Sequence, residues 1–144
     1  MNSRLDNDTL KRLAKTALDM RSMAYTPYSH FTVGAGLITK AGKIYTGCNI
    51  ETSTFTPTSC AERTAIFKAV SEGERDFAAI CIAGGNEGEA PTDFCPPCGV
   101  CRQVMSEFCE ADFEVILVKS ETELAVYTLD EVLPLQFTLY TGDK

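Results

Sequence analysis

Three cysteines in this sequence have the types and spacing of metal ligands. Two residues separate Cys98 from Cys101, a gap that lets neighbouring thiolates at a helix start bind one tetrahedral ion. Cys60 precedes another expected helix and could supply a third ligand. A zinc ion with three protein ligands keeps one open position, where it can bind a water and lower its pKa to about 7. The spacing therefore predicts a catalytic rather than a structural zinc site.

A carboxylate lies close to the first of these cysteines. Glu62 follows Cys60 by two residues and could reach a metal-bound water without being a ligand, acting first as general base and then as general acid. Ser59 and Glu62 also form the pattern of a capping box, in which Glu62 would only close the helix start. However, Cys60-Ala-Glu62 followed by Pro97-Cys98-Gly-Val-Cys101 matches the pattern of zinc deaminases. The two motifs together favour the catalytic interpretation.

The composition limits the classes of protein and partner. The 144 residues are 44% hydrophobic and 23% charged, so we expect one globular domain over 1–144. A formal net charge of −7 opposes binding to nucleic acid. Apolar runs such as 78–83 are far shorter than the roughly 18 residues of a membrane helix, so we expect no membrane partner. Seven cysteines, an odd number, favour thiolate chemistry in a reducing compartment, and we expect a cytoplasmic location.

The elements that must position these residues follow from hydrophobic periodicity and turn residues. The expected order is a helix at 8–24, strands at 31–37 and 44–50, a helix from 61 that Gly73 ends, a strand at 77–83, a helix at 98–109, strands at 115–118 and 124–128, and a short helix or turn at 129–137. The continuous apolar run at 77–83 is typical of a strand buried on both faces. This order predicts an α/β fold with a mixed sheet between layers of helices.

Several ordered motifs resemble those of the small homotetrameric cytidine deaminases. The motifs are Tyr28-Ser-His-Phe-Thr-Val-Gly-Ala35, Gly47-Cys-Asn-Ile-Glu51, Cys60-Ala-Glu-Arg-Thr-Ala65 and Pro97-Cys-Gly-Val-Cys-Arg-Gln103. The resemblance extends from 28 to 137 and implies a three-layer α-β-α sandwich around a five-stranded mixed sheet. It also implies one zinc ion per chain, a nucleoside substrate, a homotetramer, and hydrolysis of cytidine and 2′-deoxycytidine to the uridines and ammonia in pyrimidine salvage.

The resemblance assigns a role to each matching position. The zinc ligands would be Cys60, Cys98 and Cys101, with Glu62 as the catalytic proton shuttle for attack of a zinc-bound hydroxide on C4. Phe31 would pack against the base, Asn49 and Glu51 would bind the ribose 3′-hydroxyl, and backbone groups around Ala61 and Pro97 would read the pyrimidine edge. Arg63 would hydrogen-bond the zinc thiolates, while Phe55 and Phe137 would contact a neighbouring subunit's site.

The segment after Glu51 departs from the family pattern. Ser53 replaces an alanine near the 5′ side of the sugar, and Phe55 replaces a tyrosine. A modified cytosine nucleoside therefore stays open as an alternative substrate.

Other interpretations of the cysteines belong to a different functional class. Cys95, Cys98 and Cys101 could begin an iron–sulfur motif, but the next expected ligand position, 105, is methionine. A thioredoxin-like redox pair at Cys98 and Cys101 would leave Cys60 and Glu62 without a role. The remaining cysteines, at 48, 81 and 109, are expected to be small buried hydrophobic residues.

Overall fold

A five-stranded sheet forms the centre of the fold. The computed structural model describes residues 3–139, and the strands in chain order are β1 (Phe31–Thr39), β2 (Ile44–Cys48), β3 (Phe77–Asn86), β4 (Glu114–Val118) and β5 (Leu124–Thr128). Their spatial order is β2-β1-β3-β4-β5. The β3 and β4 strands run parallel, and the other neighbouring strands are antiparallel. The sheet is therefore mixed, as the sequence predicts.

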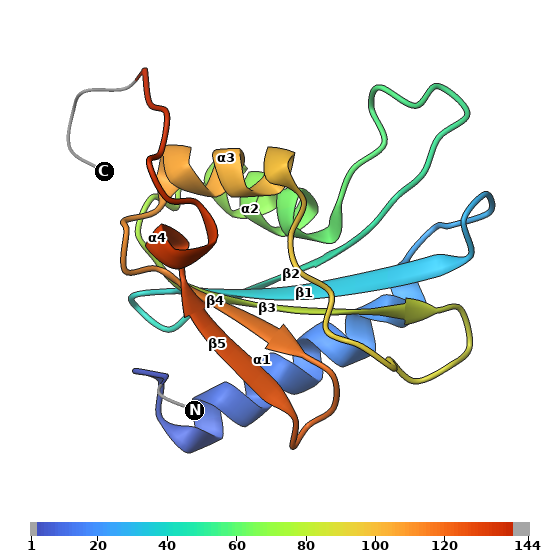
Figure 1. Cartoon of the computed structure of the whole chain (residues 1–144), viewed down its shortest axis with the longest axis horizontal. Helices are drawn as coiled ribbons and strands as arrows, with labels where there is room; N and C mark the ends of the chain where they lie inside the picture. Colours follow the sequence, from blue (N-terminus) through green and yellow to red (C-terminus); the bar gives the residue numbers. More distant parts are fainter. Residues whose placement is uncertain (1–2, 140–144) are drawn as a thin grey trace.

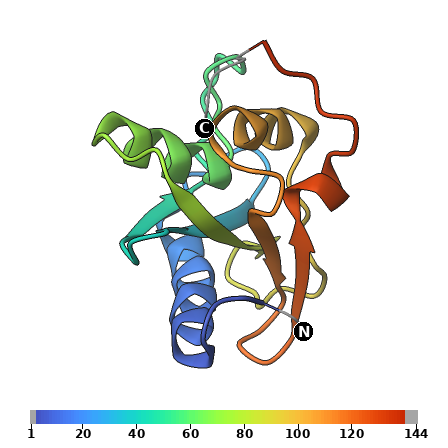
Figure 2. The same cartoon turned by 90° about the vertical axis from the view of Figure 1, so that its left-hand side faces the viewer.

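Helices cover both faces of this sheet (Figures 1 and 2). One face carries α1 (Asn7–Met20), which continues into a 3₁₀ turn at Arg21–Met23. The opposite face carries α2 (Ala61–Ser71), α3 (Gly99–Phe108) and the short α4 (Leu129–Val132). The predicted three-layer α-β-α architecture and the predicted order of helices and strands are confirmed. No helix within 3–139 is long and apolar enough to cross a membrane.

Strand β3 contributes side chains to the two apolar cores, one on each face of the sheet. Successive side chains of a strand point to opposite faces. Ile80 and Ile82 pack under α2 and α3, whereas Ala79, Cys81 and Ala83 pack against α1, and all five are fully buried. Burial of one isoleucine side chain stabilises a fold by roughly 1.5–3 kcal/mol. The continuous apolar run therefore stabilises both interfaces with the helices.

The end of β3 differs from its prediction. The sequence places the strand at 77–83 because Gly84 and Gly85 are expected to interrupt it, but β3 continues to Asn86. Both glycines pair with β1. A Cβ atom on Gly84 would lie 2.7 Å from Cys95 Sγ, and one on Gly85 would lie 2.9 Å from Arg21 Nη2. The glycines thus permit close packing in a continuing strand.

Other element ends also differ by a few residues, among them the end of β1, which is Thr39 rather than residue 37. The second strand ends at Cys48 rather than residue 50, although Ile50 makes isolated bridges to Tyr25 and Ser59. The first α-helix ends at Met20, before the 3₁₀ turn, rather than at residue 24. The last helix ends at Val132, and Pro134 follows it. Proline disfavours helical geometry in the residue before it, which explains why this helix is short.

Candidate metal centre and active site

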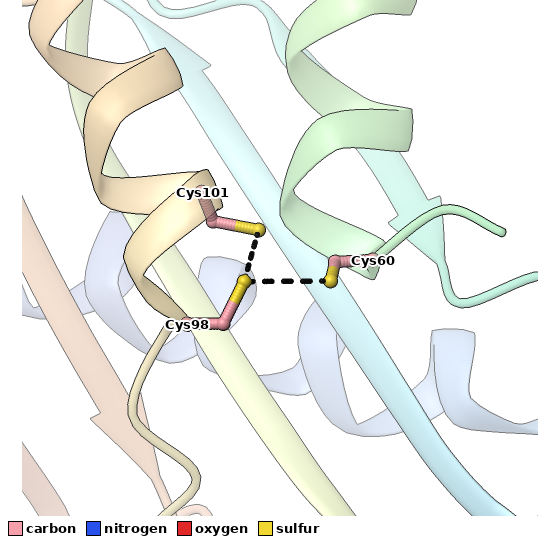
Figure 3. Close-up of side chains that lie close together, drawn as sticks. All are labelled: Cys60, Cys98 and Cys101. Atoms are coloured by element: carbon pink, nitrogen blue, oxygen red, sulfur yellow. Dashed lines mark hydrogen bonds between the residues drawn. The ribbon is translucent and has the colours of Figure 1, made fainter. Parts of the chain in front are cut away.

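Three thiols converge where α2 and α3 begin (Figure 3). Cys60 is the N-cap residue of α2, Cys98 is the N-cap residue of α3, and Cys101 lies in the first turn of α3. The Sγ atoms of Cys60 and Cys98 are 3.8 Å apart, and those of Cys98 and Cys101 are 3.5 Å apart. Sulfurs at about 2.3 Å from a tetrahedral zinc ion would be separated by about 3.8 Å. The cluster therefore fits zinc, as predicted.

The helix starts favour negative charge at this position. Neither Cys60 nor Cys98 makes a side-chain capping hydrogen bond, so both thiols remain available for a metal. The positive end of each helix dipole points toward the N-terminus and stabilises thiolates there. The two helices thus assemble a three-thiolate site from segments separated by 38 residues.

Arg63 adds positive charge from the first turn of α2. Its Nη2 donates a hydrogen bond to Cys60 Sγ at 2.9 Å, which is the contact expected from the sequence. The pKa of Cys60 is lowered to about 5, first by hydrogen bonding with the Cys101 thiol and then by Arg63. The same interaction with Cys60 raises the pKa of Cys101. These contacts therefore favour the thiolate form of Cys60.

Glu62 is buried beside this cluster. Its side chain lies on the first turn of α2 and is 4% exposed. Burial raises its pKa to about 7, and the nearby Cys60 charge adds to the increase. The capping-box alternative is wrong, because Cys60 rather than Ser59 is the N-cap and Ser59 Oγ donates to the Cys60 carbonyl at 3.2 Å. The carboxyl is thus poised to exchange a proton near neutral pH.

A cavity of about 220 Å³ opens onto the cluster and Glu62. Six of the predicted site residues line it, namely Asn49, Glu51, Cys60, Ala61, Glu62 and Cys98. The lining also includes Val33, Cys95 and Pro96, which the sequence did not assign to the site. Val33 shares the strand face of Phe31, so alternation along β1 could have identified it. Cys95 and Pro96 lie in an irregular loop without a periodic signal.

Two predicted substrate contacts lie outside the lining of this cavity. Phe31 lines an adjoining hollow of about 290 Å³, which shares Cys95 and Pro96 with the first cavity. Pro97 is fully buried, and its carbonyl accepts a hydrogen bond from Arg102 Nε at 2.8 Å. Phe31 therefore lies next to the cavity, whereas Pro97 is buried and does not line it.

The polar side chains of Asn49 and Glu51, which line the cavity, are held by β1 and the preceding loop. The Asn49 side chain accepts from Val33 N and donates to the Phe31 carbonyl, both at 2.9 Å. The Glu51 carboxylate accepts from the loop at Tyr28 and Ser29. Hydrogen bonding from Ser29 is the main cause that lowers the pKa of Glu51, which favours its ionised, accepting form.

The remaining cysteines and aromatics have simpler surroundings. Cys48, Cys81 and Cys109 are buried free thiols, as expected. Within the described part of the chain, the possible metal ligands form the three-cysteine cluster without Cys95, which does not support the iron–sulfur alternative. Phe55 and Phe137 are 77% and 65% exposed in the single chain.

Comparison with known proteins identifies relatives across most of the chain. Residues 7–117 match the family profile described as the cytidine and deoxycytidylate deaminase zinc-binding region. A cytidine deaminase of Halalkalibacterium halodurans is 46% identical over 88% of this chain and 92% of its own. A blasticidin-S deaminase of Bacillus cereus is 33% identical over 88% of this chain and 90% of its own. The crystal structure of a cytidine deaminase from Burkholderia pseudomallei has a TM-score of 0.80 and 40% identity, covering 88% of this chain and 97% of that one.

Proposed function

Because the chain belongs to the cytidine deaminase family and is a zinc-dependent hydrolase with cytidine deaminase activity, we propose that Glu62 moves the protons of this reaction. The observation that carries the proposal is a 4% exposed carboxyl in the same cavity as the thiol cluster. Its pKa of about 7 makes both the proton-accepting and the proton-donating form accessible near neutral pH.

The cluster and Glu62 divide the chemistry between them. Cys60, Cys98 and Cys101 would hold the zinc ion, which would supply the Lewis acidity that makes a water nucleophilic toward C4 of the base. Glu62 accepts one proton from that water and donates it to the pyrimidine ring. It then carries the second proton to the departing amino group, so that cytidine and water become uridine and ammonia. Burial of Glu62 limits the loss of these protons to bulk water.

The opposite wall of the cavity supports a nucleoside substrate. Asn49 and Glu51 line the cavity and are proposed to bind the ribose 3′-hydroxyl. Phe31, in the adjoining hollow, is proposed to pack against the base. Backbone groups at Ala61 and at Pro96 and Cys98, which flank the buried Pro97, line the cavity and are proposed to read the edge of the base. Cytidine and 2′-deoxycytidine both carry the groups that these contacts require, so both are proposed substrates in pyrimidine salvage.

The assembly and location of the enzyme are further parts of the proposal. Phe55 and Phe137 expose large apolar surfaces that would be buried against neighbouring chains in a homotetramer. Light scattering of the zinc-loaded protein checks the assembly, and a monomer would contradict it. Seven free thiols suit the reducing cytoplasm.

The test of the proton shuttle is the Glu62→Gln variant. Glutamine keeps the size of the side chain but cannot accept a proton, so kcat/KM for cytidine should fall by roughly 10²–10⁴-fold while one zinc per chain remains bound. Ultraviolet absorbance follows deamination, and elemental analysis gives the zinc content. Glu107→Gln, at an exposed position of α3, is the matched control and should keep full activity. A fully active Glu62→Gln variant would overturn the assignment.

A second candidate substrate class is a modified cytosine nucleoside. The similarity to the blasticidin-S deaminase favours it, together with the altered segment from Thr52 to Phe55. Comparing kcat/KM for cytidine, 2′-deoxycytidine and blasticidin S separates the candidates. A larger kcat/KM for blasticidin S than for cytidine would show that the modified nucleoside is the preferred substrate.

A further inference from the structure

We propose that Ser29 is a positioning residue for the sugar-binding side of the active site. Its hydroxyl connects Glu51, which lines the cavity, to the first residue of β1, Phe31. This inference rests on the proposed function, because it takes Glu51 as the acceptor for a ribose hydroxyl. It adds a residue that belongs neither to the lining of the cavity nor to the metal cluster.

The Ser29 hydroxyl accepts one hydrogen bond and donates another. Phe31 N donates to Ser29 Oγ at 3.1 Å, and Ser29 Oγ donates its single proton to Glu51 Oε2 at 2.5 Å. The second bond is short, as expected when the acceptor is a charged carboxylate. Because a hydroxyl has one proton, the bond to Glu51 leaves Ser29 only acceptor capacity for Phe31. The start of β1 and the carboxylate are thus fixed by one side chain.

The same contacts limit how Glu51 can bind a ligand. A carboxylate has about four lone-pair sites, two on each oxygen. Tyr28 N and Ser29 N donate to Oε1 at 3.1 and 3.2 Å, which uses both sites of that oxygen. Ser29 Oγ takes one of the two sites on Oε2. One acceptor site therefore remains, on the oxygen that Ser29 orients, and a substrate hydroxyl would bind there.

The backbone between Ser29 and Phe31 supports a maintained geometry. His30 has φ of 56°, a left-handed conformation that is uncommon for a residue other than glycine. Its N–H donates to the Thr26 carbonyl at 3.0 Å, and its carbonyl accepts from Glu87 N at 2.8 Å. These contacts hold the turn that brings Phe31 N onto Ser29 Oγ.

The test compares two substrates on the zinc-loaded enzyme. In Ser29→Ala we expect KM for cytidine to rise roughly tenfold with kcat changed less than twofold, because a hydrogen bond to a charged group is lost from the orientation of Glu51. For 3′-deoxycytidine, which lacks the hydroxyl that Glu51 would bind, KM should rise much less, because only the contact of Ser29 with Phe31 N is then lost. Ser29→Thr, which restores the hydroxyl at an exposed position, should restore the KM for cytidine.

Controls separate the failure of this proposal from the failure of the proposed function. Ser22→Ala removes another exposed hydroxyl, which donates to Asp19 O at 2.9 Å, and should change neither KM. If Glu51→Gln raises the KM for cytidine more than that for 3′-deoxycytidine but Ser29→Ala does not, the proposed role of Ser29 is wrong and the contact of Glu51 with the sugar stands. If Glu51→Gln also fails to distinguish them, the sugar contact itself is wrong. An equal loss on both substrates in Ser29→Ala, without recovery in Ser29→Thr, would also overturn the proposal.

Discussion

At the scale of single residues, Arg63 brings a positive charge next to the metal cluster. Three thiolates around a divalent ion carry a net negative charge, and the guanidinium that donates to Cys60 Sγ at 2.9 Å offsets part of it. The Arg63 Nε atom is buried and has no hydrogen-bond partner within the described residues. The interaction with Cys60 is therefore the main polar contact that this side chain makes there.

Replacing Arg63 by glutamine should weaken zinc binding. Loss of a group that hydrogen-bonds a metal ligand costs roughly 10–100-fold in metal affinity. Arg63 lowers the pKa of Cys60, so the variant should have a higher Cys60 pKa. Protons then compete with zinc for the Cys60 thiolate up to a higher pH. The pH at which half the zinc is lost should therefore move upward. Competition with a chelator, measured across pH, tests both effects.

The control for this prediction is Arg12→Gln on the exposed side of α1, which removes the same charge far from the cluster. Its zinc affinity and pH profile should match the wild type. If Arg63→Gln behaves in the same way as the control, the guanidinium contributes nothing to the metal site.

The residues of the site were predictable to different degrees. Cys98 and Cys101 are fixed by local spacing, because ligands with two residues between them at a helix start meet in any fold that keeps the helix. Glu62 follows in the same way from its distance to Cys60. Phe31 depends instead on how the irregular loop at Cys95 folds over Gly84, and local spacing contains no information on that packing.

At the scale of elements, glycine residues let a helix and a strand approach closely, because they have no side chain. Gly47 lies on β2, directly beneath the first turn of α2. A Cβ atom at this position would lie 2.2 Å from Ala61 O and 2.7 Å from Ala65 N, both backbone atoms. Since backbone cannot move as a side chain can, the contact sets the position of the helix that carries Glu62.

Gly47→Ala should therefore damage the fold and the site together. Overpacking against side chains costs about 1–3 kcal/mol, and contact with helix backbone should exceed that range. The shift of α2 should also move Cys60 away from its partners in α3, so zinc per chain should fall. Chemical denaturation gives the stability, and elemental analysis gives the zinc content.

Gly99→Ala is the matched control, because Gly99 lies between two metal ligands but an added Cβ atom would meet nothing within 4 Å. It should keep the wild-type stability and zinc content. Equal behaviour of the two variants would show that close approach at Gly47 does not position α2.

The elements were mostly predictable, since their types depend on hydrophobic periodicity. The errors occur where tertiary packing overrides a local signal. Gly84 and Gly85 are expected to end a strand, yet pairing with β1 and close packing of Cys95 and Arg21 keep them in β3. Ile80 and Ile82 face one side of the sheet and their neighbours face the other. The apolar run alone does not show which helices cover each side.

At the scale of the whole molecule, the metal cluster connects parts of the chain that the sheet alone does not join. Cys60 begins α2 and Cys98 begins α3, with β3 and a long loop between them in the sequence. Binding of a ligand to the folded state alone stabilises that state by mass action. Zinc should therefore act on the stability of the whole fold and not only on catalysis.

Removing zinc should lower the melting temperature of the protein. At free zinc a hundred times above its dissociation constant, binding contributes about 2.7 kcal/mol. For a chain of this size, that free energy corresponds to roughly 10 °C. Thermal unfolding followed by circular dichroism, before and after dialysis against a chelator, measures the change. Adding zinc back should restore the original value.

Two cysteine variants show whether this effect comes from the cluster. Cys98→Ala removes a ligand, so its melting temperature should already be low and should not respond to the chelator. Cys48→Ala removes a buried thiol outside the cluster and should keep the full response. If the Cys98→Ala variant still loses stability on chelation, the stabilising zinc is bound elsewhere, and the two helix starts do not depend on the metal to remain together.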